Sequence, residues 1–177
     1  MLTLRGLVAG AILLSALPAW CSDEEGTRAF TAPWWGLDSA TMYAGFYGLR
    51  GPQAWDEGLL GLELRAGHFW WELRLMTGAL AASDGSAYFY AGLLADIPIA
   101  NVLHVILSIA PGLYSPGSVH QLGFPLIFRS TVELSVSVSH LVRLGVSASH
   151  MSNAKLAFQN PGVESLSLTL TVLALPY

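Results

Sequence analysis

The sequence predicts an all-β protein: an eight-stranded antiparallel transmembrane β-barrel of the outer membrane. The chain is strongly apolar, with 53% hydrophobic residues and a mean hydropathy of +0.52. Beyond its N-terminal residues 1–21, no apolar run approaches the ~20 residues that a membrane-spanning helix needs. The hydrophobicity instead comes in short segments that alternate with polar residues, which is typical of membrane strands.

The N-terminal residues are typical of a secretory signal peptide. Arg5 precedes the apolar run 7–17, and Pro18–Cys21 follow it. An apolar run of this length is too short to anchor the chain in a membrane. We therefore expect residues 1–21 to be a signal peptide and residues 22–177 to form a single β-barrel domain, a usual size for one domain.

Composition and charge exclude several functional classes. Cys21 is the only cysteine, so an intrachain disulfide and a thiolate metal cluster are excluded. Cys21 also raises the alternative of a lipoprotein, but Trp20 is far bulkier than the small residue expected before a lipidated cysteine. The formal net charge is −4, and no run of basic residues is present. Nucleic-acid binding requires a footprint of Lys and Arg, so we expect no nucleic-acid partner.

Eight segments have the period-2 alternation of strands with one apolar face. Their expected bounds are about 40–49, 58–66, 69–79, 87–97, 102–114, 124–138, 141–151 and 163–176. Several are longer than the ~9–11 residues that a tilted membrane strand needs, and eight is the smallest common strand number of such barrels.

The charged residues of these segments fall on the side opposite the large apolar residues. We expect this polar side to line a narrow, filled lumen in which acidic and basic side chains pair, so that the lumen is a packed core and not a pore. The polar side carries Glu63, Arg65, Glu72, Arg74, Asp96, His104, Ser108, Arg129, Glu133 and Arg143.

Aromatic residues near strand ends are expected to form interface girdles, with ordinary core aromatics as the alternative. They are Trp34, Trp35, Tyr43, Tyr47, Trp55, Trp70, Trp71, Tyr88, Phe89 and Tyr90.

The connections between the segments alternate between short and long. Tight turns are expected at 67–68, 98–101 and 139–140, and longer loops at 50–57, 80–86, 115–123 and 153–162. Short turns of outer-membrane barrels face the periplasm and long loops face outward. Segment 141–151 therefore runs outward and places His150 and Ser152 at the extracellular rim.

Three polar residues interrupt the apolar face of the last two segments. His150 and Ser152 continue the parity of Val146 and Ala148, and Glu164 shares the parity of Leu166. A serine hydroxyl becomes a strong nucleophile when a base accepts its proton and a third group orients that base. The Cβ atoms of His150 and Ser152 are expected to lie roughly 6.5–7 Å apart, and Glu164 begins the antiparallel neighbour, within reach of the imidazole.

The pattern His150-x-Ser152-Asn153, followed by Asn160-Pro161-Gly162-x-Glu164, resembles the active-site signature of the lipid A 3-O-deacylases, the PagL family of outer-membrane enzymes. The resemblance implies a catalytic triad of Ser152, His150 and Glu164 on the outside of the barrel. It also implies that the Asn153 amide and the backbone N–H of Lys155 bind the oxyanion, and that Asn160 supports the site. Lys155 departs from the family pattern, in which a small residue, often Gly, is expected.

The resemblance further implies a serine esterase that hydrolyses the 3-position acyl ester of lipid A in outer-leaflet lipopolysaccharide and releases a 3-hydroxy fatty acid. No cofactor or metal is expected, and homodimerisation is implied as a family trait.

One alternative is a non-catalytic small outer-membrane barrel with a structural or binding role, whose rim tolerates polar residues at ~0–1 kcal/mol each. Another is a soluble eight-stranded barrel that carries a lipophilic ligand, with apolar residues inward and charges outward. We expect the other histidines to be turn, lumen or loop residues: His68, His104, His120 and His140.

Overall fold

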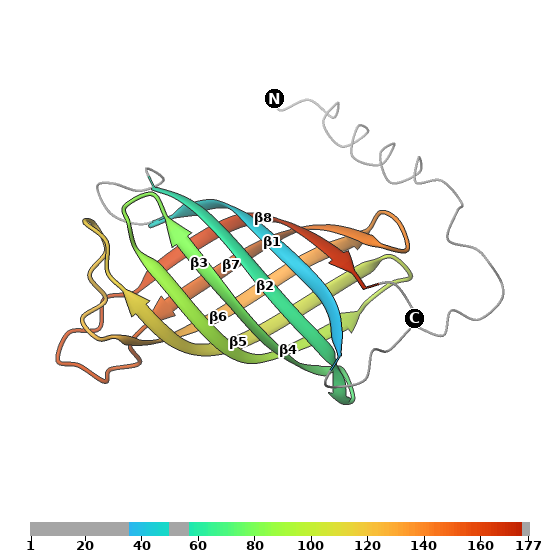
Figure 1. The fold of residues 1–177 in the computed structure, drawn as a ribbon, viewed down its shortest axis with the longest axis horizontal. Coiled ribbons are helices and arrows are strands. Elements are labelled where there is room, and N and C mark those ends of the chain that lie inside the picture. Colours follow the sequence, from blue (N-terminus) through green and yellow to red (C-terminus); the bar gives the residue numbers. More distant parts are fainter. Residues whose placement is uncertain (1–35, 50–56, 175–177) are drawn as a thin grey trace, which may run out of the picture.

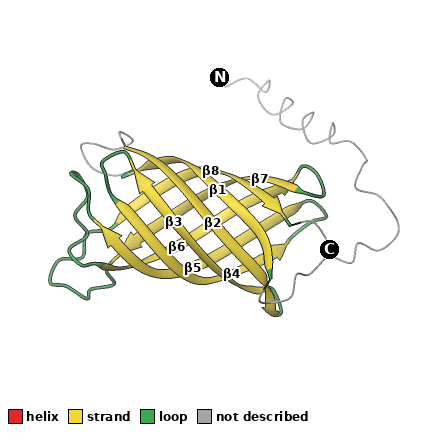
Figure 2. Ribbon diagram, in the orientation of Figure 1, coloured by secondary structure: helices red, strands yellow, loops and turns green. Residues whose placement is uncertain are grey.

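The computed structural model describes residues 36–49 and 57–174, and these residues form a closed antiparallel barrel of eight strands (Figures 1 and 2). Each strand pairs with its neighbours in sequence, and β1 closes the barrel by pairing with β8. The predicted fold class is therefore confirmed. The strands are β1 Leu37–Tyr47, β2 Glu57–Trp70, β3 Leu73–Ala82, β4 Ala87–Pro98, β5 Leu103–Ser115, β6 Leu126–Ser137, β7 Val142–Ser152 and β8 Val163–Leu173. Within the described ranges, no helix has the length and apolarity to cross a membrane.

The barrel wall is apolar outside and polar inside. In β6, for example, Val132 is 55% exposed whereas the neighbouring Glu133 is 1% exposed. Successive strand residues point to opposite faces, so this contrast repeats along the strand. A soluble lipophilic carrier would have the reverse arrangement, and the structure therefore contradicts that alternative.

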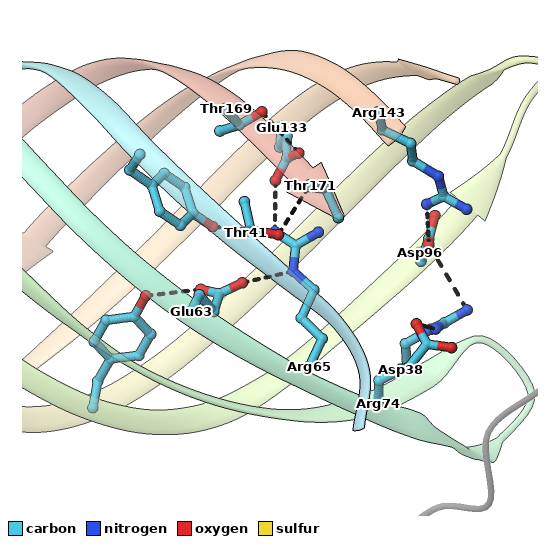
Figure 3. Close-up of polar contacts among 12 residues, drawn as sticks. Asp38, Thr41, Glu63, Arg65, Arg74, Asp96, Glu133, Arg143, Thr169 and Thr171 are labelled. Atoms are coloured by element: carbon cyan, nitrogen blue, oxygen red, sulfur yellow. Dashed lines mark hydrogen bonds and ion pairs between the residues drawn. The ribbon is translucent and has the colours of Figure 1, made fainter. Parts of the chain in front are cut away.

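The centre of the lumen holds a buried ion-pair network (Figure 3). Arg65 donates from Nε to Glu63 and from Nη2 to Glu133, each at 2.8 Å. Glu133 also accepts from the Thr169 hydroxyl at 3.1 Å, and Glu63 accepts from the Tyr90 hydroxyl at 2.8 Å. These contacts join strands β2, β4, β6 and β8 across the lumen, as the parity of the charged residues predicts.

A second network lies nearer the short turns and is centred on Asp96. Its carboxylate contacts Arg143 at 2.7 Å. It also contacts His104 Nδ1 at 2.8 Å. Arg74 pairs with Asp38 and lies 3.8 Å from Asp96. The lumen positions predicted for these residues are confirmed. Asp38 was not predicted, because the first strand begins three residues earlier than expected.

The boundary between β2 and β3 differs from the prediction. Instead of turning at 67–68, β2 continues to Trp70 through irregular pairing between Arg65 and Trp70. The turn falls on Trp71, with a φ of 49°, and Glu72. The prediction that Glu72 is a lumen counter-ion was therefore wrong. Extra residues at a β-bulge shift the alternation, so parity could not locate this turn.

The aromatic residues divide between the lumen and the outer wall. Trp70, Trp71 and Phe89 are 71%, 73% and 63% exposed, which fits the predicted girdles. Trp34, Trp35 and Trp55 lie outside the described residues. Four tyrosines predicted for the girdles are instead buried core residues: Tyr43, Tyr47, Tyr88 and Tyr90. Their hydroxyls have polar partners inside the barrel, which a lipid-facing position would not provide.

The two ends of the barrel have different connections. Short turns at 71–72, 99–102 and 138–141 join strands at one end. The other end carries the β1–β2 connection, only part of which is described, the four-residue loop 83–86, and the longer loops 116–125 and 153–162. The β3–β4 connection is thus shorter than predicted, because β3 extends to Ala82. By the rule for outer-membrane barrels the long-loop end is extracellular, and β7 delivers His150 and Ser152 there.

Candidate active site

His150 and Glu164 face each other across the β7–β8 pair at the extracellular rim. They are directly opposed in the strand register. The flanking Met151 and Val163 are 2% and 3% exposed and point into the barrel, so His150 and Glu164 point outward. The outward direction predicted for these two side chains therefore agrees with the structure.

The imidazole of His150 is oriented by the carboxylate of Glu164. The distance from Nδ1 to Oε1 is 3.3 Å, and the side chains are 52% and 21% exposed. A polar contact this exposed contributes little to stability, so its main effect is on orientation. When Nδ1–H donates to Glu164, the lone pair of Nε2 is free to accept a proton.

Gly162 provides the surface on which the imidazole lies. A methyl group built on Gly162 would be 2.4 Å from Cε1 and 3.1 Å from Nε2 of His150. The carbonyl of Glu164 accepts hydrogen bonds from the N–H groups of Gly48 at 2.9 Å and Leu49 at 3.3 Å, which attach the start of β8 to the end of β1. The sequence predicted only a loop over residues 153–162, because the space needed by the imidazole is a tertiary feature.

Ser152 is the last residue of β7 and is half-buried beside Phe128, its partner on β6. Its position two residues from His150 gives it the same outward parity. Among the described residues, no hydrogen bond joins the Ser152 hydroxyl to the imidazole. The structure thus brings His150 and Glu164 into contact. Ser152 lies two residues further along β7 and is not hydrogen-bonded to His150. Catalytic hydrogen bonds of unliganded enzymes often form only when substrate binds.

Asn153 is fully buried and connects two loops. Its side-chain amide donates to the carbonyls of Leu122 at 2.9 Å and Gln159 at 2.7 Å. Its Oδ1 accepts from the backbone N–H of Lys155 at 2.9 Å, and its own N–H donates to Oδ1 of Asn160 at 3.0 Å. Both groups predicted to bind the oxyanion therefore have protein partners in this structure. Asn160 contacts the loop as a supporting residue would.

The backbone just after the site is left-handed. Ala154 has a φ of 50° and Lys155 a φ of 65°, a region that glycine adopts far more readily than other residues. The backbone of Lys155 therefore has a conformation that favours glycine, which agrees with the small residue, often Gly, that the family pattern has at this position. The side chains of Lys155 and Leu156 are exposed.

An apolar groove runs along the outer wall from the position next to Ser152. Phe128 pairs with Ser152 on one side and with Pro111 on the other. The groove has a volume of about 830 Å³ and extends across the wall to β1. Small side chains such as Ala91 and Thr77 lie between larger ones; the larger ones include Leu37, Leu64, Leu75, Leu93 and Ile109. Alternation predicts an apolar wall but not this depression in it.

The other histidines lie apart from this site. His104 is in the lumen and contacts Asp96, and His120 belongs to the 116–125 loop. His140 is in a short turn, and His68, which was predicted in a turn, lies within β2. No group of three or more His, Cys, Asp or Glu side chains that could hold a metal ion occurs in the described ranges.

Comparisons with known proteins identify the family of the chain. A sequence model of the lipid A 3-O-deacylase (PagL) family matches residues 52–172. The crystal structure of the outer membrane enzyme PagL is similar with a TM-score of 0.57 and 21% identity, covering 76% of this chain and 98% of that one. A de novo designed transmembrane β-barrel has a TM-score of 0.57 at 9% identity, covering 78% and 96%. Comparison with curated proteins by sequence gave no match. The chain therefore belongs to the lipid A 3-O-deacylase (PagL) family and is a β-barrel of the outer membrane.

Proposed function

We propose that the chain is a serine esterase that hydrolyses the acyl ester at the 3-position of lipid A. Its family membership makes it a lipid A deacylase in general terms. The observation that carries the finer proposal is the outward-facing pair of His150 and Glu164, 3.3 Å apart at the extracellular rim. A hydrolytic site on the outer surface of a barrel is useful only for a substrate that lies in the membrane.

In the proposed mechanism, Ser152 is the nucleophile and His150 is the general base. The Ser152 oxygen attacks the ester carbonyl carbon while its proton passes to Nε2 of His150, and Glu164 stabilises the imidazolium through Nδ1–H. The tetrahedral intermediate collapses, the ester C–O bond breaks, and His150 returns the proton to the sugar oxygen. Water then attacks the acyl-enzyme by the same route and releases the 3-hydroxy fatty acid.

The oxyanion would be stabilised by the side-chain amide of Asn153 and the backbone N–H of Lys155. A donor of this kind is commonly worth about 3 kcal/mol of transition-state stabilisation. In the structure the Asn153 amide donates to Leu122 and Gln159, so this role requires one of those bonds to exchange for the substrate oxygen. Asn153→Asp keeps an oxygen that can accept from Lys155 but removes both amide donors. We expect it to lower kcat by about a hundredfold.

The apolar groove beside Ser152 supports a long acyl chain as the substrate portion. It begins at Phe128, the register partner of Ser152, and its lining is almost entirely apolar. An acyl chain in this groove would lie along the barrel wall, where membrane lipid lies already. Its ester would then be presented at the rim without leaving the bilayer.

The test is incubation of the purified protein with lipopolysaccharide, followed by mass spectrometry of lipid A. We expect the loss of one 3-hydroxyacyl chain, and no loss with Ser152→Ala. Phe89→Ser, an exposed wall residue on β4, is the folded control and should remain active. Unchanged lipid A with correctly folded wild-type protein would instead support a non-catalytic barrel.

Two further expectations remain predictions. The signal peptide over residues 1–21 lies outside the described residues, and N-terminal sequencing of the mature protein would locate its cleavage site. The homodimer implied by the family resemblance would be tested by cross-linking in native membranes. A monomer at all protein densities would contradict the second prediction.

A further inference from the structure

Exposed apolar side chains gather on two extracellular loops beside the active site. On the β7–β8 loop, Leu156 is 50% exposed and Phe158 is 105% exposed. On the β5–β6 loop, Phe124 is 38% exposed. The two loops touch, because a methyl group built on Gly123 would lie 3.2 Å from the carbonyl oxygen of Gln159. We call Phe124, Leu156 and Phe158 the apolar loop surface. Apolar side chains that gather at the surface mark sites of interaction more often than isolated ones do.

Asn153 holds this surface in a defined position. Its buried amide donates to the Leu122 carbonyl on one loop and to the Gln159 carbonyl on the other. Leu122 lies two residues before Phe124, and Gln159 directly follows Phe158. The apolar loop surface is therefore attached to the residue that follows Ser152.

The apolar loop surface continues the lipid-facing wall. On β7 and β8 below the site, Leu144, Val146 and Leu168 are 50%, 48% and 68% exposed. The β7–β8 loop projects beyond the ends of these strands (Figure 1). It thus lies at the extracellular rim, next to the lipid-facing wall.

A positive charge accompanies the apolar groups. Lys155 precedes Leu156 and is exposed, and it forms no ion pair within the described residues. An ammonium group suits the phosphate groups of a lipid headgroup, whereas the neighbouring apolar side chains suit its acyl chains.

We propose that the apolar loop surface and the Lys155 ammonium bind lipopolysaccharide at the boundary between its phosphorylated headgroup and its acyl chains, and so position the ester beside Ser152. This inference rests on the proposed function, because it assigns a recognition surface to the same substrate. A second copy of the chain is the competing occupant, and the experiments below distinguish the two.

The first experiment compares two substrates. The double variant Leu156→Ser, Phe158→Ser is assayed on lipopolysaccharide in mixed micelles and on a soluble short-chain ester. We expect the half-saturating lipopolysaccharide concentration to rise about tenfold while the rate on the soluble ester stays unchanged. Phe89→Ser makes the same chemical change at a 63% exposed position on β4 and should alter neither. No change on lipopolysaccharide, or an equal loss on both substrates, would overturn the inference.

The second experiment measures binding without hydrolysis. In a Ser152→Ala, Cys21→Ser chain, an environment-sensitive fluorophore is attached to Ala157→Cys, and lipopolysaccharide is added. We expect a blue shift that weakens in high salt and in Lys155→Asn, since asparagine tolerates the left-handed backbone. If the shift occurs but wild-type protein leaves lipid A intact, the proposed function fails and the binding surface stands. A shift that depends on protein concentration alone, or no shift, would overturn the inference.

Discussion

At the scale of single residues, the position of the His150 imidazole depends on two neighbours, the Glu164 carboxylate and the glycine at position 162. Glu164 fixes Nδ1 at 3.3 Å, and the bare backbone of Gly162 leaves room for Cε1 and Nε2. A base whose ring is held on two sides needs little reorganisation before proton transfer, which is the advantage of a preorganised site. We therefore regard Gly162 as a positioning residue.

Gly162→Ala tests this role. The added methyl would lie 2.4 Å from Cε1, so the exposed imidazole would rotate away from Glu164. We expect kcat to fall by about ten- to a hundredfold, with little change in KM or in the thermal unfolding of the barrel. Gly58→Ala is the matched control, since the nearest atom to its new methyl is 4.0 Å away. A Gly162→Ala enzyme as fast as wild type would show that the ring position is not set by this glycine.

The sequence predicted which residues of the site face outward but not how all of them are used. Alternation along a strand places His150 and Ser152 on one face, and it does so without knowledge of any neighbour. One hydrogen bond of the Asn153 amide goes to the carbonyl of Leu122, 31 residues away in the chain. A partner this distant leaves no periodic signal, so this connection between two loops could not be predicted.

Lys155 carries backbone strain that a glycine would remove. Its φ of 65° costs about 1–2 kcal/mol for a residue with a Cβ, partly offset because glycine gains more entropy in the unfolded chain. We expect Lys155→Gly to raise the free energy of unfolding by about 0.5–1 kcal/mol, measured by urea titration in detergent micelles. Ala157→Gly, in the same loop but without a positive φ, should lower it. Equal effects at both positions would contradict the strain argument.

At the scale of elements, strand pairing was predictable except where the ladder is irregular. The bounds of β7 and of the start of β8 agree with the expected segments within one residue, because their apolar alternation is uninterrupted. The end of β2 was misplaced by four residues, because the irregular pairing between Arg65 and Trp70 breaks the period. Sequence periodicity therefore predicts the ends of strands whose pairing is regular, and it fails to predict them at a bulge.

Asp84 connects two extracellular loops through hydrogen bonds to its carboxylate. It accepts from the N–H of Ser86 at 2.8 Å and from the N–H of His120 at 3.3 Å. Burial raises the pKa of this carboxyl, but the hydrogen bonds from Ser86 and His120 outweigh burial and hold the pKa below its usual range. The charged form is therefore favoured in the folded loops.

The sign of the pH effect follows from this lowered pKa. The stabilisation is complete above the unfolded pKa of about 3.9 and is lost as the pH falls through the lower folded value. We expect the amide of His120 to exchange hydrogen faster in Asp84→Asn than in wild type at pH 7, and the difference to vanish in strong acid. The effect should stay below about 1 kcal/mol, because the carboxylate is largely solvated. A difference that persists in strong acid would show that charge is not the cause.

At the scale of the whole molecule, the barrel has the reverse of the usual arrangement of a water-soluble protein. Its outer wall is apolar, and its core contains Glu63, Arg65, Arg129 and Glu133, each at most 3% exposed. Two carboxylates and two guanidinium groups balance in charge, so the network is neutral overall. Buried charges are tolerated only when paired and hydrogen-bonded, and removing one member therefore leaves a net charge in the lumen.

Glu133→Ala tests how strongly the barrel depends on this balance. The substitution removes the acceptor of Arg65 Nη2 and of the Thr169 hydroxyl and leaves a buried guanidinium in excess. We expect the free energy of unfolding to fall by about 3–5 kcal/mol, measured by urea titration in lipid vesicles. Glu57→Ala, at the partly exposed start of β2, should cost less than about 1 kcal/mol. Adding Arg65→Met to Glu133→Ala should recover part of the lost free energy of unfolding, because Arg65→Met removes the guanidinium that Glu133→Ala leaves unpaired. If the double variant is less stable than Glu133→Ala by the full cost of Arg65→Met alone, the two charges are not coupled and the lumen is held together by packing.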